Sequence, residues 1–94
     1  MGITAKGVVL TVEEPEYVSG KSGNGREYAF WSRKIDLLCD KTICKLSEST
    51  EGPQNIDDPS KLFTPVGRGA TATFAIERCR MDGRTMVFSG HFIL

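Results

Sequence analysis

Residues 26–39, REYAFWSRKIDLLC, carry the clearest structural pattern in the chain. Apolar and polar side chains alternate along it with a period of two, which is the pattern of a β-strand. One face of the strand carries Trp31, Ile35, Leu37 and Cys39, and we expect this face to pack in the core. The opposite face carries an outward row of aromatic, polar and charged side chains: Tyr28, Phe30, Ser32, Lys34 and Asp36.

The rest of the chain has the same character, because short β-branched and aromatic runs alternate with Gly, Pro, Asn and Asp clusters. Helical periodicity is almost absent, so the sequence predicts an all-β protein. The glycine-rich residues 14–25 are typical of the tip of a long hairpin, and Asp40-Lys41 and Asp82-Gly83 of tight turns. Besides residues 26–39, strands are expected at Ile3–Glu13, Thr42–Leu46, Gly67–Cys79 and Arg84–Leu94.

Irregular features are expected at two places. In the first strand, Val8, Leu10 and Val12 share one face, with Gly7 as the β-bulge that sets their phase. Residues Ser47–Pro65 are acidic and contain several prolines. They are therefore expected to form a connector with at most one helical turn.

The number and spacing of the strands predict one domain over residues 1–94, a small five-stranded OB-type barrel with long basic hairpin loops. An SH3-like barrel, or an open sheet that dimerises, would use similar strands. A chain of 94 residues has room for one modest core, and exposed strands leave unpaired edges. We therefore expect a homodimer.

Charge is balanced overall but unevenly distributed, with 12 Lys and Arg against 12 Asp and Glu. Residues 19–45 hold six basic and three acidic side chains, residues 46–60 hold four acidic and no basic ones, and residues 61–94 hold five basic and two acidic ones. The two predicted hairpins fall on the basic segments. The distribution therefore indicates a polyanion partner despite the zero net charge.

Binding of single-stranded nucleic acid requires cations for the phosphates and flat rings for the bases. Tyr28 and Phe30 are the candidate stacking residues, with the alternative that they face the core while Trp31 faces out. Arg78 and Arg80 share one face of the second hairpin, and the alternative there is a hairpin kept soluble by its charge. The complete candidate set is Lys21, Arg26, Tyr28, Phe30, Lys34, Arg78, Arg80 and Arg84.

The sequence gives little support for a phosphate-binding loop or for a catalytic site. Gly20-Lys21-Ser22 lacks the earlier glycine of a phosphate-binding loop, and no helix follows it. His91 has no neighbouring nucleophile, so it is expected to be packed in the last strand and not catalytic. We therefore expect no enzyme activity, no cofactor and no small-molecule substrate.

The cysteines do not have the spacing of a metal site. Cys39, Cys44 and Cys79 include no Cys-x-x-Cys pair, so they are expected to be buried, reduced thiols and no metal is expected. No apolar run approaches the roughly 18 residues of a membrane span, and Met1–Gly7 has no signal pattern. A cytoplasmic location without a membrane partner follows as an expectation.

Residues 18–30, VSGKSGNGREYAF, resemble the DNA-binding wing of the small single-stranded DNA-binding proteins of filamentous bacteriophages. The shared features are a Ser-Gly tip and a Gly-basic-x-Tyr return. Phe74–Arg84, an apolar strand followed by a basic hairpin, lies where that family has a loop projecting near its dimer axis. The resemblance covers Tyr17–Leu94. It implies an OB-type homodimer that coats single-stranded DNA cooperatively during DNA replication, without sequence preference or catalysis.

By position, Arg26 and Tyr28 match the basic residue and the stacking tyrosine of that wing, and Phe30 matches an apolar wing residue. The sequence departs from the family in its zero net charge, in Glu27 between the matched pair, in Trp31 and in Ser89-Gly90-His91. RNA stays open as a partner beside DNA. A second hypothesis is a protein-interaction module that docks a peptide by strand addition.

Overall fold

The computed structural model describes residues 2–93, whose regular structure is almost entirely β-strand. The six strands are β1 (Ile3–Val12), β2 (Glu16–Lys21), β3 (Glu27–Cys39), β4 (Thr42–Thr50), β5 (Thr71–Asp82) and β6 (Thr85–Ile93), and one 3-10 helix, η1, spans Pro59–Leu62. No helix within these residues has both the length and the apolar character needed to cross a membrane.

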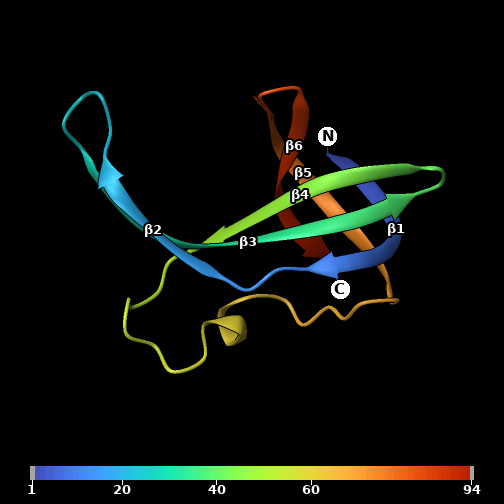
Figure 1. Cartoon of the computed structure of the whole chain (residues 1–94), viewed down its shortest axis with the longest axis horizontal. Coiled ribbons are helices and arrows are strands. Elements are labelled where there is room, and N and C mark those ends of the chain that lie inside the picture. Colours follow the sequence, from blue (N-terminus) through green and yellow to red (C-terminus); the bar gives the residue numbers. More distant parts are fainter. Residues whose placement is uncertain (1, 94) are drawn as a thin grey trace.

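Hydrogen bonding joins five of the strands into a ring in the order β1-β5-β6-β4-β3, and β1 closes the ring by pairing with β3 (Figure 1). β1 has two neighbours because its residues 3–8 pair with β5 and its residues 8–12 pair with β3. β4 and β6 are parallel, and the other pairs are antiparallel. This barrel-like arrangement confirms the predicted five-stranded OB-type fold class.

The phase of β1 differs from the prediction. Its register shift lies between Val9 and Thr11, so the bulge is at Leu10 and the prediction of Gly7 was wrong. Before this shift, Val9 is buried on the same face as Ala5 and Gly7, and Val8 is exposed. Gly7 is needed for another reason, since a Cβ there would overlap the carbonyl oxygen of Leu38 on β3. Glycine thus allows the two strands to approach closely.

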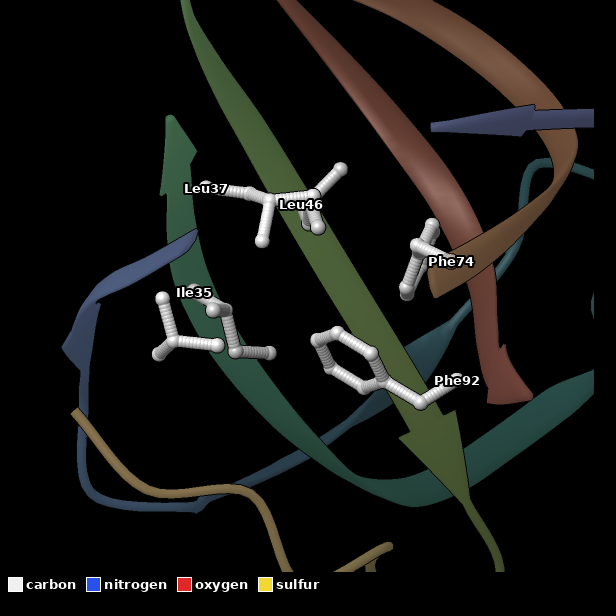
Figure 2. Packing of buried hydrophobic residues seen from close by; sticks show 6 residues of the cluster. Ile35, Leu37, Leu46, Phe74 and Phe92 are labelled. Carbon is white, nitrogen blue, oxygen red and sulfur yellow. The ribbon is translucent and has the colours of Figure 1, made fainter. Parts of the chain in front are cut away.

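The core lies inside the ring. Figure 2 shows side chains of β3, β4, β5 and β6 converging there, with Phe74 and Phe92 opposite the aliphatic residues. The two phenyl rings lie edge to face, with centroids 5.0 Å apart. Such aromatic pairs add to the free energy gained from apolar burial. The buried cluster consists of Val9, Ile35, Leu37, Leu46, Phe74 and Phe92.

Two hairpins extend beyond the ring (Figure 1). β2 was not predicted as a strand, and it pairs with residues 27–32 of β3 to form the first of them. The second consists of the outer parts of β5 and β6, whose turn has Gly83 at a φ of 65°. Such hairpin turns favour glycine at a central position with positive φ. The predicted Asp40-Lys41 turn is present, with Asp40 at a φ of 59°.

The remaining boundaries also differ from the prediction. β4 continues to Thr50 instead of ending at Leu46, and β5 runs from Thr71 to Asp82. The connector is therefore residues 51–70, and η1 is its predicted helical turn. The apolar/polar alternation did not predict these strand ends, because their residues are mostly polar on both faces. Pairing with a neighbouring strand is what holds them in the β conformation. Leu94, the predicted end of the last strand, lies outside the described residues.

The connector covers one end of the ring, where it runs below the sheet in Figure 1. Trp31 is 8% exposed, which confirms that its face of β3 is the inward one. It packs against the connector and Tyr17, and not in the central cluster: its Nε1 donates a hydrogen bond of 3.1 Å to the carbonyl oxygen of Pro53. Trp31 thus joins the connector to the sheet.

Candidate nucleic-acid interface

A groove lies on the outer face of the sheet, next to the projecting β5–β6 hairpin. It consists of two overlapping hollows of about 340 and 390 Å³ that share Phe30, Arg78 and three serines. Arg80 lines only the first hollow, and Glu77 only the second. We call it the hairpin groove, and its side chains are Phe30, Ser32, Ser47, Ser49, Glu77, Arg78, Cys79, Arg80 and Ser89.

Strand register places residues of the groove in a row that begins beside it, at Lys34 on β3. Ser47 on β4 lies opposite Lys34 on β3 and opposite Ser89 on β6, and Ser89 lies opposite Arg78 on β5. One row of side chains therefore crosses four strands. Neighbouring strands are about 4.8 Å apart, so the row spans about 14 Å.

A β-bulge places the two arginines in the groove. Phe74 and Ile76 face the core, and strict alternation along β5 would turn Arg78 and Arg80 the same way. The register of β5 with β6 shifts between Ile76 and Arg78, so Glu77 is the extra residue. After the shift, the arginines pair with the outward-facing Ser89 and Val87. The prediction that they share a face is confirmed, although the bulge was not predicted.

The aromatic residues lie on the β3 side of the groove and on the β2–β3 hairpin. Tyr28 is 43% exposed, and its ring centroid is 6.1 Å from that of Phe30, with 32° between the ring planes. Gly20, opposite Tyr28 on β2, lets this ring lie on the strand, because a Cβ there would be 2.7 Å from the tyrosine hydroxyl oxygen. The predicted outward placement of Tyr28 and Phe30 is confirmed.

Three of the predicted basic residues lie on the hairpins, outside the groove. Lys21 ends β2, and its Nζ is 4.0 Å from a carboxylate oxygen of Glu27. Arg26 follows the tip of the same hairpin, where its backbone N–H donates to the Asn24 side chain. Arg84 is exposed in the turn of the β5–β6 hairpin. These three cations lie near the tips of the two hairpins.

Lys34 is not part of the groove. It faces outward as predicted, but it lines a separate hollow together with acidic side chains. Within that hollow, Lys45 and Asp36 form an ion pair of 3.0 Å. The other carboxylates there belong to Glu13 and Asp82, so Lys34 is the predicted phosphate contact with the most acidic surroundings.

Arg33 is buried and cannot contact an external partner. It is 4% exposed, and its guanidinium donates hydrogen bonds to Glu48 and to the carbonyl oxygen of Thr64, over the ring of Phe63. Burial raises the pKa of the Glu48 carboxyl, and Arg33 offsets part of that rise. Arg33 was not placed from the sequence, although its parity with Trp31 and Ile35 is the signal that could have put it on the inward face. The net positive charge counted for residues 19–45 therefore includes one cation that is neutralised inside.

Two predictions about cysteine and histidine burial were wrong. Cys79 is exposed because β5 extends beyond the ring, whereas Cys39 and Cys44 are half-buried. Burial, together with the neighbouring Cys44 thiol, raises the pKa of Cys39 to about 11. His91 is not packed but exposed on the outer face, with Nδ1 2.7 Å from Glu77.

Comparison of the chain with protein-family models, curated proteins and solved structures gave no match.

Proposed function

We propose that this protein binds single-stranded nucleic acid, with DNA as the first partner to test, along the hairpin groove and without sequence preference. The observation that carries the proposal is the position of the half-buried ring of Phe30, next to the exposed ring of Tyr28, on β3 across a serine-lined floor from Arg78 and Arg80 on β5. A cationic wall opposite a stacking surface is the general arrangement for binding an unpaired strand.

The arginines, the serines and Phe30 of the groove, and Tyr28 next to it, each have a role in this proposal. The guanidinium groups of Arg78 and Arg80 present planar sets of donors that match phosphate oxygens. Tyr28 and Phe30 offer ring faces on which bases stack, as any base can do whatever its identity. The serine hydroxyls both donate and accept hydrogen bonds, and their small size lets the strand approach the sheet.

The same features favour a single strand over a duplex. In a duplex the base faces are already stacked on their neighbours, so Tyr28 and Phe30 would have no partner. In the single-stranded complex, the hairpin-tip cations Lys21, Arg26 and Arg84 would bind phosphates of the nucleic acid beyond the groove. A homodimer that coats single-stranded DNA during replication, as the phage resemblance implies, is the form of this function that we propose.

Fluorescence anisotropy tests the proposal with a labelled oligothymidylate and a duplex of the same length. The oligothymidylate should bind more tightly, and the logarithm of its affinity should fall linearly with the logarithm of salt concentration. Equal affinity for the duplex would contradict the stacking role.

The protein-interaction hypothesis predicts a different result in the same titration. Among the described residues β2 pairs only with β3, so its outer edge can accept an added strand. A peptide bound at that edge through main-chain hydrogen bonds would show little dependence on salt. Absence of oligothymidylate binding would therefore favour this second function.

A further inference from the structure

One carboxylate lies where phosphates would bind. Glu77 lines the hairpin groove beside Arg78, and its side chain is 61% exposed. A carboxylate next to a phosphate path lowers affinity through like-charge repulsion. The same carboxylate is 2.7 Å from Nδ1 of His91, which is also exposed. Histidine is the side chain that changes charge between about pH 5 and pH 8.

We propose that His91 and Glu77 form a proton-controlled gate that sets the affinity of the hairpin groove for the phosphates of a single strand. The inference rests on the proposed function and adds its regulation. With neutral His91, the Glu77 charge is uncompensated and opposes the phosphates. With protonated His91, the pair is neutral, and the two arginines act without that opposition.

The bulge in β5 explains why this pair exists. His91 lies on the outer face of β6 opposite Ala75, and Gly90 lies opposite Ile76. Glu77 is the extra residue of the bulge, so its side chain is free of the strict alternation and reaches back to His91. At Gly90 a Cβ would overlap the carbonyl oxygen of Ala75, so glycine permits this close approach of β5 and β6.

Few other charged groups face His91 within the described residues. From β5 they are Glu77 and, next along the strand, Arg78. From β4 it is Glu48, whose carboxyl pKa is raised by burial, with Arg33 and then His91 offsetting part of that rise, and which is held by the buried Arg33. Glu77 is therefore the one charged side chain of this set that is both exposed and in contact with His91.

The test measures the affinity of the full-length protein for a rhodamine-labelled oligothymidylate at fixed ionic strength, at about pH 5.5 and about pH 8. The wild type should bind about two- to fivefold more tightly at the lower pH, because the interaction of one exposed charge pair changes affinity only by a factor of this size. His91→Gln should abolish this difference. Glu77→Gln should bind at about pH 8 as tightly as the wild type binds at about pH 5.5.

The gain of affinity in Glu77→Gln separates the gate from a structural role, because a loss of folding would weaken binding. Equal wild-type affinity at both pH values, or an unchanged pH response in His91→Gln, would overturn the gate while leaving the proposed function intact. Absence of binding at both pH values would overturn the proposed function and the gate together. Thermal melting of each variant confirms that the folded protein is being compared.

Discussion

Tyr28 and Trp31 are three residues apart on β3, so their side chains lie on opposite faces and their substitutions should have separate effects. Tyr28→Ala should weaken single-strand binding by about 1–3 kcal/mol with little change in melting temperature. Trp31→Ala should instead lower the free energy of unfolding by about 3–5 kcal/mol, because it empties a buried aromatic site. Tyr28→Phe is the matched control that keeps the ring. If Tyr28→Ala melts the protein while Trp31→Ala keeps the fold and loses binding, the two roles are reversed.

Arg33 and Glu48 form a buried pair, so removing one partner should cost more than removing both. Arg33→Met should destabilise the fold by about 3–5 kcal/mol, and Arg33→Met/Glu48→Leu should recover much of that loss. Urea unfolding measures both values. A double variant no more stable than Arg33→Met would contradict the idea that the unpaired charge causes the loss.

The same variant gives a prediction for pH. Burial already raises the pKa of the Glu48 carboxyl, and loss of Arg33 removes the group that lowers it most. The folded state of Arg33→Met then binds a proton more tightly than the unfolded chain. The free energy of unfolding of this variant should therefore be higher at low pH. The contribution of Glu48 to it should be lost as pH rises through the folded-state pKa of that carboxyl. Unfolding curves at about pH 5 and about pH 7 test this, and a flat profile would contradict it.

At the scale of the elements, close approach of strands depends on glycines in β1 and β6. Gly7→Ala would force its Cβ against the Leu38 carbonyl oxygen at the crossing of β1 and β3, and should destabilise the fold by about 1–3 kcal/mol. Gly67→Ala is the matched control, because its Cβ would meet no atom within 4 Å. Denaturant midpoints compare the two variants. Equal midpoints would show that the crossing tolerates a side chain.

The strands were predictable where one face is buried, because apolar and polar residues then alternate in the sequence. The inward residues of β3, together with Leu46, Phe74 and the Asp40-Lys41 turn, follow from periodicity and turn chemistry alone. A bulge in the first strand was predicted from its phase, but its position at Leu10 and the bulge at Glu77 did not follow, because the position of a bulge depends on the partner strand.

The same limit applied to the candidate site. Arg78 and Arg80 were placed on one face, but which face they occupy depends on the Glu77 bulge. β2 was missed because its residues have no buried face and are held by pairing with β3. The acidic surroundings of Lys34 were also not predictable, since Asp82 comes from a hairpin distant in sequence.

For the molecule as a whole, we expect a homodimer in solution. Met81 and Met86 lie opposite each other on the β5–β6 hairpin and are both exposed, and no other strand in residues 2–93 pairs with the outer edge of β2. Exposed apolar pairs and free edges favour association. Light scattering at micromolar concentration should give about twice the chain mass of 10.3 kDa. A mass near that of one chain would exclude the dimer but not the binding function.

The salt dependence of oligothymidylate binding shows whether the hairpin groove holds the phosphates of a single strand. Each phosphate contact on a single strand contributes about 0.7 to the slope of log affinity against log salt. Arg78→Ala/Arg80→Ala should therefore lower the magnitude of the slope by about 1.4. Lys61→Ala/Arg68→Ala, which removes two exposed connector cations outside the groove, should leave it unchanged. An unchanged slope in the groove variant, or an equal loss in both variants, would contradict the claim.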